Sequence, residues 1–149
     1  MVIFGYEHEW GMMLPDDDDV WRVMITSDFK NNVIVWKGYD KEIAQYTLDN
    51  VVIWDIQELI SNQKKLFQIE KLEEDFPSVT DIPCYDFFFA DNEGRHKLLS
   101  GYMFGYRRGK VSDFPNTDFV INLTLKIQKI LQDNGINIEM WDNKHYSDD

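Results

Sequence analysis

Four consecutive aspartates, Asp16 to Asp19, concentrate carboxylate oxygens of the kind that bind divalent cations. A calcium-binding loop instead places its ligands at alternate positions and uses a glycine to turn around the ion. This run has neither feature, and four unpaired carboxylates cannot be desolvated in a core. We therefore predict no metal ion here. We expect a solvent-exposed turn beside Trp21 that contributes to recognition of a basic protein partner.

A second set of potential metal ligands is the segment EHEW, residues 7 to 10. If the segment is extended, Glu7 and Glu9 share one face and His8 takes the other. The three histidines of the chain show no metal-ligand spacing. The sequence therefore predicts an exposed polar edge here, with Trp10 packed inward.

The single cysteine, Cys84, stands between a proline and a tyrosine at the start of an apolar run. A nucleophilic cysteine needs a nearby base, and no neighbour in sequence supplies one. We predict a small buried side chain. One cysteine cannot form an internal disulfide, no basic leader precedes Glu7, and no apolar run approaches the ~20 residues of a membrane span. We expect a soluble, cytoplasmic protein.

Residues 94 to 110 contain five lysines and arginines and no acid, although the chain carries a net charge of −12. Glycines recur at every fourth position, without the spacing of a nucleotide-binding loop. Stacked tyrosines and arginines can hold single-stranded nucleic acid, but the acidic field of the chain would repel phosphates. A sheet edge with solvated cations, a protein interface and an anion site all stay open. The candidate partner-binding residues of this segment are Tyr102, Tyr106, Arg107 and Arg108.

Two hairpins account for most of the expected sheet. β-Branched and aromatic runs at 20–27 and 31–39 predict the first, which 41–48 extends with a weaker alternation. The run 84–90, the turn DNEG and the run 95–110 predict the second. We also expect a short last strand at 136–141 and a flexible tail at 142–149.

Two segments have helical spacing. The first has a plausible cap at Asp49 or Asn50 and ends before Pro77, with Trp54 expected in the core. The second begins near Pro115 with Asn116 or Thr117 as its cap, and ends at Gly135. The expected inner positions are Val52, Ile56, Leu59, Ile60 and Leu66 or Phe67 in the first helix, and Phe119 or Val120, Leu123, Ile127, Ile130 and Leu131 in the second.

Because strands and helices do not alternate strictly, we predict one α+β domain spanning residues 1–149. Its expected architecture is a mainly antiparallel sheet of about five or six strands, with two amphipathic helices packed mainly on one face.

The chain is small, acidic and rich in aromatic residues, and it has no catalytic motif. In these respects, and faintly in the helix VVIWDIQELIS, it resembles the small acidic bacterial immunity proteins that neutralise toxins. The resemblance implies a stoichiometric inhibitor whose acidic surface meets a basic toxin domain, without cofactor, nucleic acid or membrane. It supplies no motif from which functional residues can be transferred.

Two other functions remain open. One is a regulatory or structural subunit that oligomerises, as a homodimer for example, through an edge strand. The other is a small enzyme with an acidic site, although we expect no catalytic activity. The enzyme interpretation would gain support if three of its candidate acids and bases lined one pocket. These candidates are Glu7, Glu9, Asp86, Asp91 and His96.

Overall fold

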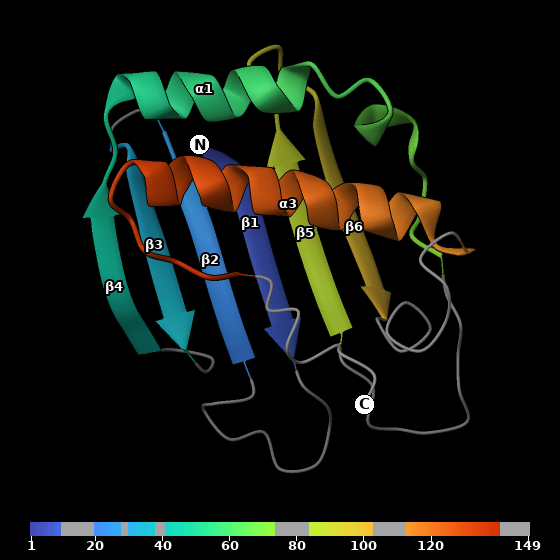
Figure 1. The fold of residues 1–149 in the computed structure, drawn as a ribbon, viewed down its shortest axis with the longest axis horizontal. Coiled ribbons are helices and arrows are strands. Elements are labelled where there is room, and N and C mark those ends of the chain that lie inside the picture. The colour runs from blue at the N-terminus through green and yellow to red at the C-terminus, as the bar shows by residue number, and fades with distance from the viewer. Residues whose placement is uncertain (10–19, 28–29, 38–40, 74–83, 103–112, 141–149) are drawn as a thin grey trace.

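The computed structural model describes residues 1–9, 20–27, 30–37, 41–73, 84–102 and 113–140 (Figure 1). Within these ranges, six strands form one antiparallel sheet in the order β4-β3-β2-β1-β5-β6. The strands are β1 (Val2–Glu9), β2 (Val20–Thr26), β3 (Asn32–Lys37), β4 (Lys41–Thr47), β5 (Cys84–Ala90) and β6 (His96–Tyr102).

Two α-helices, α1 (Asn50–Ser61) and α3 (Pro115–Asp133), lie over the same face of the sheet, and the short 3₁₀ helix η2 (Leu66–Gln68) follows α1 (Figure 1). The predicted α+β architecture is therefore confirmed, with both hairpins in the expected segments. No helix among the described residues combines the length and apolar character needed to cross a membrane.

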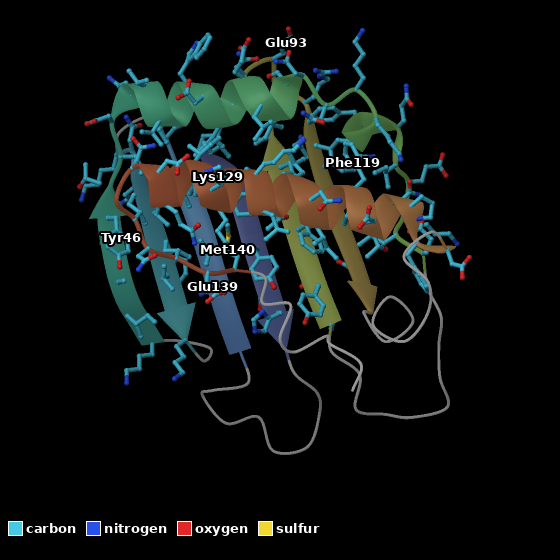
Figure 2. All side chains as sticks on the ribbon, in the orientation of Figure 1. Tyr46, Glu93, Phe119, Lys129, Glu139 and Met140 are labelled. Atoms are coloured by element: carbon cyan, nitrogen blue, oxygen red, sulfur yellow. The ribbon has the colours of Figure 1, made fainter. Side chains whose placement is uncertain are left out.

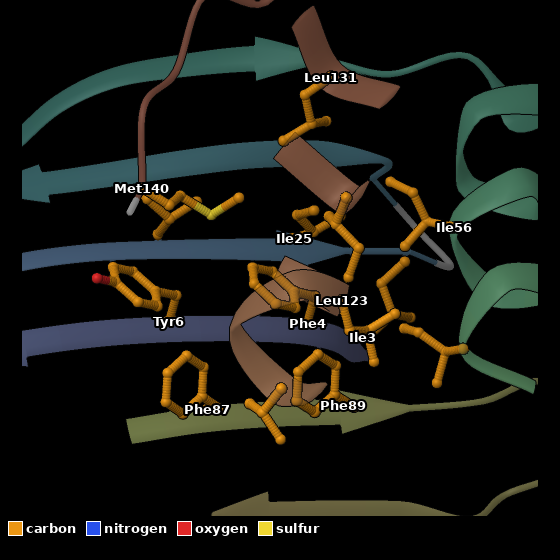
Figure 3. Close-up of a cluster of buried hydrophobic side chains, with 14 of the residues drawn as sticks. Ile3, Phe4, Tyr6, Ile25, Ile56, Phe87, Phe89, Leu123, Leu131 and Met140 are labelled. Carbon is orange, nitrogen blue, oxygen red and sulfur yellow. The ribbon is translucent and has the colours of Figure 1, made fainter. Parts of the chain in front are cut away.

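The core lies between the sheet and the helices. Alternate side chains of each strand point into it, as period-two burial requires. In β5, for example, Tyr85, Phe87 and Phe89 are fully buried, whereas Asp86 and Phe88 are half-exposed on the opposite face. Figure 3 shows buried side chains from β1, β2 and β5 meeting side chains from both helices.

The segment 136–140 is not the predicted strand. It pairs with none of the described strands, and the Ile138 amide donates to the Ile136 carbonyl at 3.0 Å in a tight turn. Ile136, Ile138 and Met140 are buried in the core, and Met140 is labelled in Figure 2. Side chains of α3 bind its backbone: Gln132 Nε2 donates to the Ile138 carbonyl at 3.0 Å, and the Met140 amide donates to Gln128 Oε1 at 2.6 Å. The apolar alternation is thus satisfied by packing against the sheet face rather than by strand pairing.

Helix α1 is shorter than predicted, and its tryptophan is not in the core. The helix ends at Ser61, so Leu66 is buried from η2 instead. Trp54 is 58% exposed. At 3.6 residues per turn, it lies roughly 200° around the axis from both Val52 and Ile56, which face the sheet. Asp49 does occupy the cap position, but its side chain makes no capping hydrogen bond.

Helix α3 receives its cap from a distant residue, so the prediction of Asn116 or Thr117 is wrong. Phe114 holds the cap position and Pro115 the first turn. The Glu73 carboxylate accepts hydrogen bonds from the amides of Asn116 at 3.1 Å and Thr117 at 2.9 Å. This carboxylate satisfies two amides that the helix itself cannot pair. At the other end, Gly135 has the expected positive φ of 83°.

The predicted polar edge at EHEW is also wrong, because β1 lies between β2 and β5 in the middle of the sheet. Glu7 pairs with Asp86 and His8 with Tyr85, so Glu7 and His8 lie on opposite faces as expected. Cys84, on the same face as Asp86, is half-exposed rather than buried, because no described helix covers that face. Trp10 lies outside the described residues.

Candidate protein-binding face

The sheet face opposite the helices is covered by no element in the described parts of the chain. We call it the open face. It is crossed by two neighbouring rows of residues, which the strand registers define. The first row is Glu42, Trp36, Arg22, Glu7, Asp86 and Ser100, and the second is Gln45, Ile34, Met24, Gly5, Phe88 and Leu98.

The first row is polar and predominantly acidic. Glu7 lies opposite Asp86 on the adjacent strand, and the Ser100 hydroxyl donates a hydrogen bond to Asp86 Oδ1. Arg22, the cation of the row, lies opposite Glu7, and its guanidinium carbon is 4.4 Å from the centre of the Trp36 ring. Three carboxylates therefore share the row with a single guanidinium.

The second row is apolar and contains a hollow at its centre. Gly5 has no side chain, so the chain surface dips between Met24 and Phe88 on the flanking strands. The hollow has a volume of about 240 Å³. Leu98, on its outer side, is 64% exposed. Glu7 and Asp86 are among the residues that line the same hollow.

The sequence-predicted partner-binding residues are distributed unevenly over the structure. Trp21 lies in β2 opposite His8, and Tyr102 ends β6 opposite Cys84. The remaining predicted residues, Asp16, Asp17, Asp18, Asp19, Tyr106, Arg107 and Arg108, lie outside the described residues, as does the tail 142–149.

Among the predicted acids and bases, the described structure brings Glu7 and Asp86 into one hollow but adds no third from that set. His96 lies at the margin, where its ring stacks on Phe88 with centroids 6.2 Å apart. Across the described ranges, no group of three His, Cys, Asp or Glu side chains is placed to hold a metal ion.

Asp91 belongs to a structural turn beyond the end of β5. Its Oδ1 accepts hydrogen bonds from the amides of Glu93 at 2.9 Å and Arg95 at 2.8 Å, and its Oδ2 accepts one from Arg95 Nε at 2.6 Å. Burial opposes ionisation, but the hydrogen bonds from Arg95 outweigh it and hold the pKa of Asp91 below its usual value. Arg95 also lies 4.3 Å above the Phe67 ring. The Ser61 hydroxyl, at the end of α1, donates to Asn92 Oδ1 at 2.9 Å. Together these contacts hold the turn against η2 and the end of α1.

Two further apolar exposures lie away from the open face. On α1, Val51 and Trp54 are 69% and 58% exposed. On β4, at the edge of the sheet, Ile43 and Tyr46 are 44% and 37% exposed (Figure 2). Each of these two sites has two exposed apolar side chains, whereas in the second row of the open face Leu98 is exposed and Ile34, Met24 and Phe88 are half-buried. The open face differs from both in combining its apolar row with a hollow and a row of carboxylates.

The residues that sequence reasoning missed are the apolar ones of the open face, chiefly Met24, Phe88 and Leu98. Their signal lies in the strand pattern itself. A strand with one solvated face alternates apolar and polar residues, whereas these strands are apolar at positions of both parities. Such a run indicates a strand whose outer face is also suited to burial.

No protein-family model, curated protein or solved structure matches the chain.

Proposed function

We propose that the protein is a non-catalytic binding module, a stoichiometric inhibitor of the immunity type, which docks a basic protein partner on the open face. A toxin nuclease domain is a partner with the required charge. The observation that carries this proposal is the combination of an apolar row and an acidic row on a sheet face that no described element covers.

The apolar row supplies the surface that association can remove from water. Large exposed apolar patches rimmed by polar residues mark interaction sites in soluble proteins. Phe88 and Leu98 are direct neighbours in register, and Met24 lies across Gly5 from Phe88, so the three side chains surround the hollow on two sides. Complete burial of an exposed apolar side chain contributes roughly 1.5–3 kcal/mol. Leu98, which is 64% exposed, therefore has the most to gain, and the half-buried Met24 and Phe88 gain less.

The acidic row favours a partner with positive charge. Glu7, Glu42 and Asp86 outnumber Arg22 on this face, and the whole chain carries a net charge of −12. Complementary charge steers encounter and disfavours acidic partners. A polyanion such as nucleic acid would be repelled by both the local row and the overall field.

The test of this function is co-purification of the tagged protein from its native host, followed by native mass spectrometry of the complex. We expect a basic protein in one-to-one stoichiometry. Leu98→Arg places a cation on the open face and should abolish the complex. Val51→Arg, at a site of comparable exposure on α1, is the matched control and should not. A complex that survives Leu98→Arg but not Val51→Arg would place the partner on α1 instead.

The exposed edge of β4 supports a second candidate, a subunit that oligomerises by strand addition. Ile43 and Tyr46 offer apolar contacts there. Against this, the register of β4 shifts between the partners of Val35 and Trp36, and the strand begins with Lys41 and Glu42. Bulges and charges are the devices by which proteins protect an edge from pairing. Dimerisation that Ile43→Lys abolishes would favour this candidate over the first.

A further inference from the structure

The hollow over Gly5 differs from the face around it, because its shape and lining select one kind of occupant. Small-molecule sites usually have volumes of ≈ 300–1,000 Å³. At about 240 Å³, and open to solvent, this hollow is below that range. It therefore fits a single side chain better than a whole cofactor or substrate.

The lining of the hollow is apolar at the base and along two walls. Gly5 forms the base, Met24 and Phe88 flank it, and Leu98 extends the wall beyond Phe88. A side chain entering here needs an apolar stem or a flat surface to contact these groups. Phe88 offers an aromatic ring, which also stacks on His96 with 28° between the two planes.

Two acidic residues also line the hollow. Glu7 and Asp86 both line it, from neighbouring strands in direct register. The Ser100 hydroxyl donates to one oxygen of Asp86, and a carboxylate can accept about four hydrogen bonds in all. An occupant with several N–H donors and a positive charge can therefore bind Asp86 while Ser100 stays in place.

Arg22 also lines the hollow and is the cation that an incoming positive charge would meet. Its guanidinium lies over the Trp36 ring on β3, on the far side of β2 from β1 and β5. Its Nε is buried. The cation is thus held toward Trp36, whereas Asp86 lies on the opposite side of β1.

We propose that the hollow over Gly5 receives an arginine side chain of the basic partner. The aliphatic stem packs on Met24 and Leu98, and the guanidinium stacks on Phe88 and binds the carboxylates of Glu7 and Asp86. Guanidinium combines planar stacking with forked donation to carboxylates, which ammonium cannot do. The inference rests on the proposed function, since it names the side chain that the open face recognises.

The direct test is titration of the isotope-labelled protein with a capped Gly-Arg-Gly tripeptide at millimolar concentrations, followed by amide NMR. We expect shifts at Gly5, Met24, Phe88 and Leu98. The same peptide with citrulline, a neutral isostere of arginine, should bind about tenfold more weakly, because hydrogen bonds to charged groups are the stronger ones. A lysine peptide should also bind more weakly. Equal binding of the three peptides, or shifts confined to α1, would overturn the proposal.

A second experiment uses two variants that alter the hollow itself. A Cβ at Gly5 would lie 3.5 Å from the Cβ of Phe88, an ordinary contact, so Gly5→Ala should fold and reduce peptide binding. Asp86→Asn should reduce it while keeping an acceptor for Ser100. Unchanged binding in both folded variants would contradict the proposal.

The failure of this inference can be distinguished from failure of the proposed function. If the arginine peptide does not bind but the host complex forms and is lost with Leu98→Arg, the open face binds its partner by other contacts. If no complex forms in the host, the proposed function itself fails.

Discussion

Glu7 and Asp86 lie directly opposite each other on β1 and β5, with both carboxylates on the open face. Like charges directly opposite across a strand pair destabilise a sheet. Arg22 lies opposite Glu7 on β2, and the Ser100 hydroxyl donates to Asp86, so both carboxylates have favourable neighbours that oppose this repulsion. A net cost in stability that persists despite these neighbours would support a binding role for the pair.

This relationship predicts a trade-off. Asp86→Asn removes the repulsion and keeps the acceptor for Ser100, so the free energy of unfolding should rise by about 0.2–1 kcal/mol. The same variant should bind the basic partner more weakly. Urea unfolding and calorimetric titration measure the two quantities. A variant that loses stability and retains full affinity would contradict the binding role of the pair.

The turn at Asp91 predicts how stability depends on pH. The pKa of Asp91 is lower in the folded state than its usual value of 3.8. Asp91 therefore contributes its full stabilisation to the free energy of unfolding above pH 3.8, and this contribution is lost as the pH falls through the lowered pKa. Asp91→Asn should lower the free energy of unfolding by about 1–3 kcal/mol at pH 7 and flatten the loss below pH 3.8.

The control for this prediction is Glu93→Gln. Glu93 is 72% exposed at its side chain and lies 3.9 Å from Arg95, so its contribution to stability should be small. Thermal unfolding followed between acidic and neutral pH compares the variants. If stability falls equally steeply with decreasing pH in the wild type and in Asp91→Asn, Asp91 does not contribute to the acid sensitivity of the fold.

The remote cap of α3 predicts a loss of stability far from the helix in sequence. Glu73→Ala removes the acceptor for the amides of Asn116 and Thr117 and should cost about 0.5–2 kcal/mol, the range for loss of a capping side chain. Glu70→Ala, an exposed neighbour, is the control. Chemical denaturation measures the free energy of unfolding of both variants. Equal effects of the two substitutions would mean that the cap contributes little.

The aspartate run lies outside the described residues, and its predicted role concerns rates. Asp16 to Asp19 should steer a basic partner toward the protein, an effect that can raise association rates by about 10 to 1,000-fold. Replacing all four with asparagine should leave stability unchanged, slow association and flatten its dependence on ionic strength. Stopped-flow binding across a salt series measures this. Identical rates at every salt concentration would leave the run as a solvated turn.

Local sequence patterns predicted most of the sheet because the hairpins carry their own signals. The run before the DNEG turn is rich in aromatic residues, which favour strands, and the turn supplies Gly94 with its positive φ of 87°. β1 is less apparent, because Gly5 interrupts the pattern and the acids that follow it resemble a solvated edge. Its place in the middle of the sheet is decided by pairing with β2 and β5, which are distant in sequence.

Other features could not be predicted because they depend on tertiary contacts. Burial of Ile136, Ile138 and Met140 gives the same apolar alternation in a strand as in a segment without strand pairing that glutamine side chains hold. The cap from Glu73 joins residues more than forty positions apart. The exposure of Trp54, in contrast, could have been predicted from its position in the helical repeat relative to Val52 and Ile56.

The hollow was hidden from sequence reasoning for the same reason. Gly5, Phe88 and Leu98 come together only through the register of three strands. Phe88 and Leu98 would each be assigned to the core by residue type alone. Only their position relative to the buried neighbours Phe87 and Leu99 places them on the open face.

Site-specific photo-crosslinking in the native host tests whether a basic protein binds the open face. Benzoylphenylalanine replaces Leu98 on the open face in one strain and Trp54 on α1 in another, both exposed positions. We predict a covalent adduct with one basic protein from position 98 and none from position 54. An adduct from position 54 alone, or none from position 98, would contradict the claim.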